Sequence, residues 1–218
     1  MATPTPQTAP PGGLRERKKQ RTRDALIRAA LELFTEQGYD TTTIDEIAEA
    51  VDVSQRTYFR YFANKEEVVF AVQEMVEARF LEELSARPGS EAPLTALRSA
   101  VMVAWDDIGN AIESVIPVEL HMRSYRMIES TPALVAVHLR RSSELEEQIA
   151  RLLAGREGLD VDADPRPRVL VAAFSGVMRV AGKVWGEGQD CSVASIRELT
   201  KSYLDHLAPA MHDDWRAR

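Results

Sequence analysis

Hydrophobic residues recur along the chain at intervals of three and four positions, and no segment shows the strict alternation of a half-buried strand. The pattern therefore predicts an all-α protein of about nine helices, divided by glycine and proline residues. The longer expected helices begin at about residue 15 or 22 and at residues 65, 93, 119, 131, 166 and 192, and they end at about residues 37, 87, 109, 129, 156, 185 and 207. A loop is expected over residues 155–167.

Two short amphipathic helices follow the first helix, and the turn between them is so tight that they must cross. A T-x-x-E capping box at Thr43 begins the first of them. Asp52 tolerates the left-handed conformation of a sharp turn, and Ser54 caps the second helix. Tyr58 and Phe62 can turn inward while neighbouring polar side chains face outward. This arrangement is typical of a helix-turn-helix that reads DNA, although an ordinary helical hairpin shows a similar periodicity.

The second short helix carries hydrogen-bond donors suited to base edges and phosphates. Arg56 and Gln55 are best suited to bidentate recognition of guanine and adenine, respectively. Thr43, Tyr61 and Lys65 are better suited to holding phosphates. From this segment, the residues expected to contact DNA are Thr43, Ser54, Gln55, Arg56, Thr57, Phe59, Arg60, Tyr61 and Lys65.

The segment just before these helices is strongly basic. Residues 1–23 hold six arginines and lysines against the single acid Glu16, so they carry +5, and the rest of the chain carries −12 of the total −7. Charge segregated in this way favours a polyanionic partner, although a basic run alone is more often a solvated tail. Residues 1–14, rich in proline, threonine and alanine, are expected to be a disordered leader. The basic residues expected to contact DNA are Arg15, Lys18, Lys19 and Arg21.

From about Arg15 to Val69 the chain resembles the N-terminal DNA-binding domain of the TetR family of bacterial regulators. The resemblance rests on a first helix ending in Gly38-Tyr39, a threonine-capped second helix, and a recognition helix closing in an aromatic cluster before Lys65. Phe59 stands where the family usually has tyrosine, so that phosphate contact through a hydroxyl is absent. The remainder resembles the acyl-CoA-like ligand-binding domain of mycofactocin-type actinobacterial regulators. The resemblance implies a DNA-binding domain over residues 15–64 and a ligand-binding and dimerisation domain over residues 65–218.

The second domain must supply a ligand cavity and a dimer interface if the resemblance holds. A cluster of methionine and aromatic residues suits an adaptable apolar cavity, but it is equally consistent with ordinary core. Its candidate lining residues are Met102, Trp105, Leu120, His121, Met122, Tyr125, Phe174 and Met178. Arg123 and Arg126 are candidates to meet the phosphates of an acyl-CoA, or they are solvated surface residues.

Small and β-branched residues on the last two helices suit a four-helix bundle between two copies. These faces can instead bury against the chain's own helices. The candidate interface residues are Ala173, Gly176, Val177, Val180, Val184, Leu199, Tyr203 and Leu207. A single fourth helix from Lys65 to about Arg87 is expected to connect the two domains as a lever, so that a ligand near Met75, Arg79 or Phe80 changes DNA binding.

Enzymatic function is disfavoured, because the sequence has no G-x-S-x-G, H-E-x-x-H, P-loop or G-x-G-x-x-G motif. Asp160, Asp162 and Asp164 mimic the start of a calcium loop, but Pro165 and Val171 occupy positions that need glycine and glutamate. No metal or cofactor is therefore expected.

Cys191 is the only cysteine, which fits a reducing cytoplasm, and no continuous apolar run approaches the length of a membrane span. The sequence therefore predicts a cytoplasmic homodimeric regulator, most simply a repressor, whose partners are operator DNA and a small apolar ligand. The alternative is a helical ligand-binding or scaffolding protein with a vestigial DNA-binding module.

Overall fold

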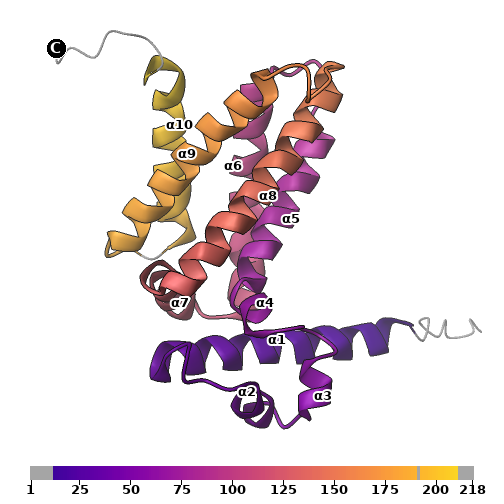
Figure 1. Ribbon diagram of the computed structural model, residues 1–218, viewed down its shortest axis with the longest axis vertical. Coiled ribbons are helices and arrows are strands. Elements are labelled where there is room, and N and C mark those ends of the chain that lie inside the picture. The colour runs from indigo at the N-terminus through magenta and orange to yellow at the C-terminus, as the bar shows by residue number, and fades with distance from the viewer. Residues whose placement is uncertain (1–11, 191, 211–218) are drawn as a thin grey trace, which may run out of the picture. The chain divides into compact units, whose positions relative to one another are not determined.

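The computed structural model describes residues 12–190 and 192–210, which form ten α-helices and contain no strand (Figure 1). The predicted all-α class is confirmed. The chain forms two compact units that adjoin in sequence between Val69 and Phe70. The sequence placed this boundary earlier, between Asn64 and Lys65.

The first unit contains four helices. They are α1 (Gly12–Gln37), α2 (Ile44–Ala50), α3 (Gln55–Tyr58) and α4 (Lys65–Val69). Gly38 ends α1 with a φ of 97°, a conformation that glycine adopts without strain. Because α1 begins at Gly12, Gly12–Leu14 belong to a helix and not to the leader expected over residues 1–14; residues 1–11 lie outside the described part of the chain. The apolar face of α1, including Leu26, Ile27, Leu31 and Phe34, is buried.

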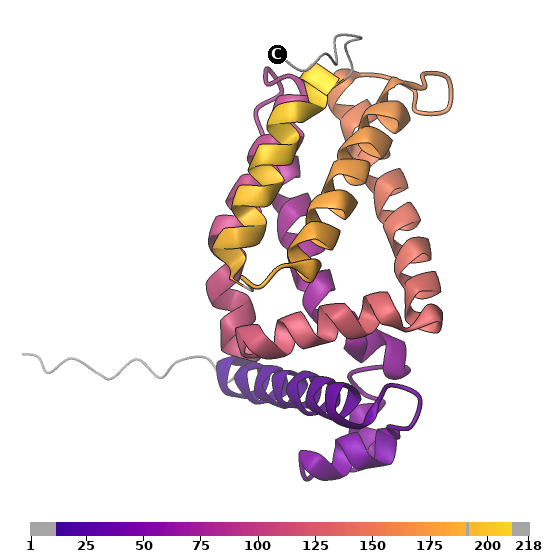
Figure 2. The same cartoon turned by 90° about the vertical axis from the view of Figure 1, so that its left-hand side faces the viewer.

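The second unit contains six helices. They are α5 (Ala71–Ala86), α6 (Pro93–Val115), α7 (Val118–Ser130), α8 (Pro132–Glu157), α9 (Arg166–Glu187) and α10 (Val193–Ala210). α5 packs along α6, α8 along α9, and α9 along α10. α7 crosses one end of this bundle, where it connects α6 to α8 (Figure 2).

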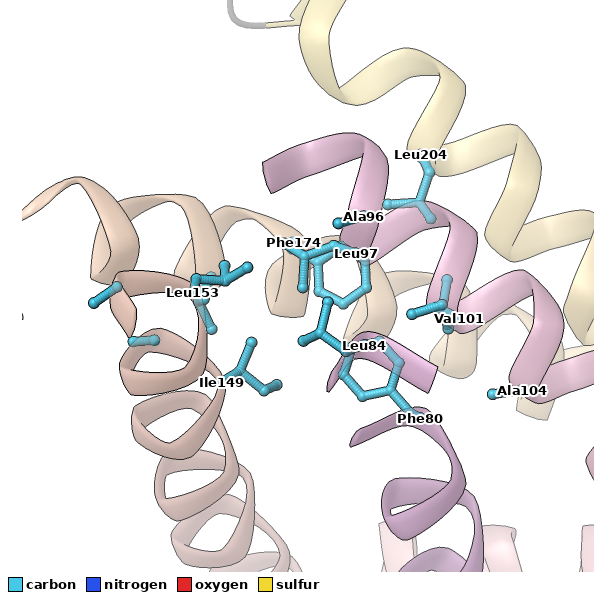
Figure 3. Close-up of a cluster of buried hydrophobic side chains, with 14 of the residues drawn as sticks. Phe80, Leu84, Ala96, Leu97, Val101, Ala104, Ile149, Leu153, Phe174 and Leu204 are labelled. Carbon is cyan, nitrogen blue, oxygen red and sulfur yellow. The ribbon is translucent and has the colours of Figure 1, made fainter. Parts of the chain in front are cut away.

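A hydrophobic cluster from α5, α6, α8, α9 and α10 holds the second unit together. Phe80 and Leu84 of α5 meet Leu97 of α6, Leu153 of α8 and the other labelled side chains (Figure 3). Phe80 also lies nearly parallel to Phe174, with ring centroids 5.9 Å apart. Burying one such side chain stabilises a fold by about 1.5–3 kcal/mol, so this cluster fixes the helices that surround the cavity described below.

Two expected helices have the wrong bounds. The predicted helix 65–87 is divided at Phe70, whose φ of −89° and ψ of 2° separate α4 from α5. α6 continues through Gly109 to Val115, where Pro117 forces the preceding residue to be extended. α8 ends at Glu157, one residue beyond its expected end, and Gly158 caps it in the left-handed conformation with a φ of 66°. Gly109 was thus a poor indicator of a helix end, because glycine is tolerated inside a helix that tertiary packing stabilises.

α9 is long and apolar enough to meet a simple membrane-span criterion, with a mean hydropathy of 1.3 over its most apolar window. Only 28% of that window is buried in the fold. Two of its arginines are nevertheless paired with α8, since Arg168 bonds Glu147 and Arg179 bonds Glu146 at 2.9 Å. These charges and pairs are typical of a helix that packs in a protein bundle, and the exposed apolar residues of α9 need another explanation.

Candidate DNA-binding and ligand-binding sites

The turn between α2 and α3 is built by local hydrogen bonds. Thr43 and Glu46 form a complete capping box, in which the Thr43 backbone N–H donates to the Glu46 carboxylate at 2.7 Å. This bond lowers the pKa of Glu46. Asp52 has a φ of 55°, and Ser54 accepts a hydrogen bond from the Thr57 backbone N–H at 3.2 Å to begin α3. The sequence predicted both caps and the left-handed residue at these positions.

Tyr58 and Phe62 turn inward, as predicted, and fix the orientation of α3. Tyr58 is completely buried, and its hydroxyl donates to the Asn64 carbonyl oxygen at 2.9 Å. Phe62 is 3% exposed and packs against Tyr58. Because these two rings anchor one side of the segment 55–62 in the core, its other side faces outward.

Gln55, Arg56 and Arg60 are exposed on that outer side, while Thr57 and Tyr61 are half-buried. Arg56 makes no ion pair within the described part of the chain, so its guanidinium is available to a ligand. Phe59 is 49% exposed, which is unusual for a large apolar side chain. Together these residues form a largely exposed surface of amide, guanidinium and aromatic groups.

The basic segment lies beside this surface. The N-terminal half of α1 and the residues after α3 enclose an open recess of about 610 Å³. Its lining residues are Arg15, Glu16, Lys18, Lys19, Thr22, Arg60 and Tyr61. Arg15, Lys18 and Lys19 are thus brought together with two residues of the helix-turn-helix segment, whereas Arg21 is exposed elsewhere on α1.

Lys65 is engaged within the first unit, in place of the phosphate contact expected from the sequence. Its ammonium group donates to the carbonyl oxygens of Tyr39 and Thr42, each at 2.8 Å. It also lies 4.6 Å from the centroid of the Tyr39 ring. Lys65 therefore joins the turn before α2 to the start of α4, and we withdraw it from the set of DNA contacts.

The second unit contains a cavity of about 250 Å³ among α5, α6, α7, α8, α9 and α10. Five of the eight residues expected at a ligand site line it: Trp105, His121, Tyr125, Phe174 and Met178. The other three do not, because Leu120 and Met122 are buried in packed core and Met102 packs against the main cluster. Arg123 is exposed outside the cavity, and Arg126 donates to the carbonyl oxygens of Gly186 and Gly188.

Most of the residues that α5 and α8 contribute to the cavity wall were not predicted from the sequence. Gln73, Val76 and Glu77 come from α5, and His138 and Glu146 come from α8. A single carboxylate or histidine on a long helix gives no sequence signal that it faces inward.

Burial disfavours the charged forms of three titratable groups that line the cavity. It lowers the pKa of His121 to about 4 and also lowers that of His138. It raises the pKa of Glu77, an effect that the nearby Arg141 partly offsets. Arg179, the cavity's arginine, is already paired with Glu146. Within the described part of the chain, the cavity therefore offers aromatic rings, two histidines and carboxylates, and its arginine is already paired.

Each of the two units matches a known protein family. Residues 26–72 match the model of bacterial regulatory proteins of the tetR family, and residues 91–212 match the MftR C-terminal domain. The HTH-type transcriptional regulator TcmR of Streptomyces glaucescens is 44% identical over 98% of this chain and 95% of its own. The chain belongs to the TetR family.

More distant members agree with this assignment. The mycofactocin biosynthesis regulator MftR of Mycobacterium tuberculosis is 26% identical over 81% of this chain and 86% of its own. NalD of Pseudomonas aeruginosa shares the fold with a TM-score of 0.57. It is described as the secondary repressor of the MexAB-OprM multidrug efflux pump, and it is 19% identical over 91% of this chain and 100% of its own. This TetR-family chain is thus a helix-turn-helix transcriptional regulator with a ligand-binding C-terminal domain.

The expected dimer residues of this TetR-family chain fall into two groups. Val180 and Val184 are exposed on α9, and Gly176 is half-buried there. Leu207 is only 8% exposed and belongs to the chain's own core, so it is not available to an interface as expected from the sequence. Ala173 and Val177 pack partly against that core, Leu199 packs partly against Met122 and its neighbours, and Tyr203 is half-buried.

Proposed function

We propose that this protein is a homodimeric repressor that a small, predominantly apolar ligand releases from a palindromic operator in the cytoplasm. The observation that carries the proposal is the exposed guanidinium of Arg56, which has no ion-pair partner among the described residues and lies at the start of a capped recognition helix, beside the basic recess. Arginine and glutamine read guanine and adenine edges, and basic residues hold phosphates. TcmR is named a transcriptional regulator, which supports regulation, and NalD is described as a repressor, which supports repression.

The dimer proposal is supported by unpartnered apolar residues on α9. Val169, Val180 and Val184 are 66%, 48% and 37% exposed, and they share the helix with the half-buried Gly176. An exposed line of this kind gains free energy when a second copy covers it. Two copies also present two recognition helices, which matches the two half-sites of a palindrome.

The coupling proposal is supported by a set of contacts at the start of the second unit. Phe70 is completely buried, its ring is nearly parallel to that of His138, and the Arg141 guanidinium lies 5.3 Å from its centroid. Arg141 is also paired with Glu74 at 2.9 Å and Glu77 at 3.8 Å. Because His138 and Glu77 line the cavity, a ligand that shifts them also shifts the contacts of Phe70. Phe70 directly follows α4, so the cavity is connected through few side chains to the end of the DNA-binding unit.

This coupling needs no rigid lever across residues 65–87. It requires only that ligand and DNA favour different arrangements, and the two effects are then reciprocal. Ligand binding should weaken the operator complex by about 5–150-fold, and operator DNA should weaken ligand binding by the same factor.

The experiment is a binding titration with duplex DNA taken from the region beside the gene, using fluorescence anisotropy at several salt concentrations. Specific binding to an inverted repeat, with affinity that falls steeply with salt, supports the regulator. Equal, negligible retention of all duplexes at low salt would establish the alternative, a scaffold whose DNA-binding module is vestigial. Sedimentation of the free protein at micromolar concentration tests the dimer separately.

A further inference from the structure

Phe59 is a large apolar side chain that lies exposed on the helix-turn-helix segment. It is 49% exposed, although the neighbouring rings of Tyr58 and Phe62 are buried. The apolar side of this segment is therefore already filled by two other rings. A single exposed apolar side chain is ordinary on a protein surface, so the position of Phe59 must decide what it does.

Phe59 lies on the same face of α3 as the residues proposed to read bases. Its backbone N–H donates to the Gln55 carbonyl oxygen at 3.0 Å, and its φ of −63° and ψ of −12° continue the helical conformation. Phe59 follows Gln55 by four positions and Arg56 by three, and these spacings place side chains on one helix face. All three side chains are exposed. A surface that covers Gln55 and Arg56 therefore also covers Phe59.

The ring of Phe59 is held in place by Tyr58. The two ring centroids are 5.7 Å apart, and the ring planes are perpendicular at 90°. Tyr58 is itself fixed, because it is completely buried and its hydroxyl donates to the Asn64 carbonyl oxygen. An edge-to-face pair of this kind favours one position of the exposed ring. Phe59 therefore loses little motion when a partner covers it.

The chemistry of the ring limits what it can contact on DNA. Phenylalanine carries no donor or acceptor, so it cannot form a hydrogen bond to a phosphate oxygen or to a polar base edge. The apolar group that base pairs present in the major groove is the C5-methyl group of thymine. Contact with deoxyribose is also apolar, but it would not depend on the base sequence. A ring beside two base-reading side chains is placed for the methyl group.

We propose that Phe59 specifies thymine by packing on its C5-methyl group, once in each half-site of the operator. The inference rests on the proposed function, since it requires specific DNA binding through α3. It also gives the position of the thymine. Four residues of a helix rise about 6 Å, and base pairs are spaced by about 3.4 Å, so the thymine lies within about two base pairs of the one that Gln55 contacts.

The test measures the contribution of the methyl group alone. Duplexes that carry the bound inverted repeat are prepared with single thymines replaced by deoxyuridine, which lacks the methyl group and keeps every hydrogen bond of the pair. Anisotropy titrations with the full-length protein compare them with the unmodified duplex. At one thymine position, replacement should weaken binding about fourfold in one half-site and about fifteenfold in both. At the same position, 5-methylcytosine should give tighter binding than cytosine.

Variants of the protein identify the side chain that contacts the methyl group. Phe59→Ala should weaken binding to the unmodified duplex and should no longer distinguish thymine from deoxyuridine at that position. Arg56→Ala is the matched control, because it should also weaken binding but keep the fourfold effect of the methyl group. If Phe59→Ala lowers the melting temperature sharply, Phe59→Gln, which keeps a long side chain and presents an amide, serves in its place with the same expected loss.

Specific binding without any thymine whose methyl group matters overturns the inference and leaves the proposed function standing. A methyl effect that persists undiminished in Phe59→Ala also overturns it, since another side chain then contacts the methyl group. If Phe59→Ala weakens binding to operator and random duplexes by the same factor, Phe59 packs on the sugar–phosphate backbone and the inference is wrong. Failure of the wild-type protein to bind any duplex specifically contradicts the proposed function and this inference together.

Discussion

Tyr125 of α7 packs directly on the backbone of Gly186 in α9, with no space for a side chain at position 186. A Cβ atom there would lie 2.7 Å from Cε1 and 3.0 Å from Cδ1 of the Tyr125 ring. Gly155, on α8, offers a contrast, because a Cβ atom added to it would meet no atom within 4 Å apart from its own helix and chain neighbours. Alanine at position 155 therefore tests helix propensity alone, whereas alanine at position 186 also tests the packing of the Tyr125 ring.

Gly186→Ala should lower both stability and ligand affinity, because the Tyr125 ring must move from its place in the cavity wall. The loss in unfolding free energy should be about 1–3 kcal/mol. Gly155→Ala is the matched control and should raise the unfolding free energy by up to about 1 kcal/mol. Urea denaturation of both variants measures the difference, and equal stability of the two would contradict the packing argument.

Arg56→Ala should weaken operator binding by on the order of 1–3 kcal/mol and relax the preference for one base, since it removes a bidentate pair of hydrogen bonds to a base edge. Gln55→Ala should act similarly at a neighbouring base. Arg123→Ala, which removes an exposed arginine of the second unit, is the control and should leave affinity unchanged. Anisotropy titrations with single-base operator variants measure these effects; unchanged base preference in Arg56→Ala would remove it from the set of base contacts.

Replacing Arg15, Lys18 and Lys19 together with glutamine should weaken binding to all duplexes alike. These side chains line the basic recess, and the salt slope should become shallower by about 0.9 for each phosphate that the variant no longer neutralises. The helix should remain, because glutamine is a good helix former. An unaltered salt slope in the triple variant would show that the recess does not hold phosphate.

Val180→Asp should favour monomers, because two carboxylates would be buried near the axis of the proposed dimer. The dimer should weaken by roughly a hundredfold or more, and operator affinity should fall with it. Leu139→Asp is the control, since Leu139 is 55% exposed and belongs to α8, outside the proposed interface. Sedimentation decides the matter: a wild-type protein that is monomeric at micromolar concentration makes the proposed interface wrong.

His121 should make stability depend on pH below about 6.5. Burial lowers its pKa from 6.5 to about 4, so the unfolded chain takes up this proton before the folded chain does. The free energy of unfolding should therefore fall as the pH decreases from about 6.5 to about 4, and this contribution is fully present above that range. Between about pH 7 and pH 5 the loss should be on the order of 2 kcal/mol, and His121→Phe should remove it. Denaturation curves with the same pH dependence in both proteins would exclude His121 as the source.

Local signals predicted the first unit well. The capping box at Thr43, the left-handed Asp52 and the cap at Ser54 each depend on a few adjacent residues, and the structure has all three. The partners of Lys65 could not be predicted, because Tyr39 and Thr42 lie more than twenty positions away in the sequence. Their carbonyl groups carry no side-chain signal at all.

The second unit was predicted less completely, since its cavity depends on which helical faces converge. Trp105, His121 and Tyr125 were found because aromatic and polar residues on apolar faces stand out. Met122 was a poor choice, because methionine fills a packed core as readily as it lines a cavity. Glu77 and His138 were missed because nothing in their local sequence distinguishes a residue facing a cavity from one facing water.

The two hydrogen bonds of Lys65 also bear on how the first unit opens. Because one ammonium group joins the carbonyls of Tyr39 and Thr42 to the first residue of α4, fraying of the turn before α2 must break two hydrogen bonds to α4. Amide protons of that turn and of α4 should then exchange with solvent in a single concerted event. The recognition helix lies between these two segments in the chain, so its ends are fastened together by Lys65, and we expect it to stay formed in the absence of DNA.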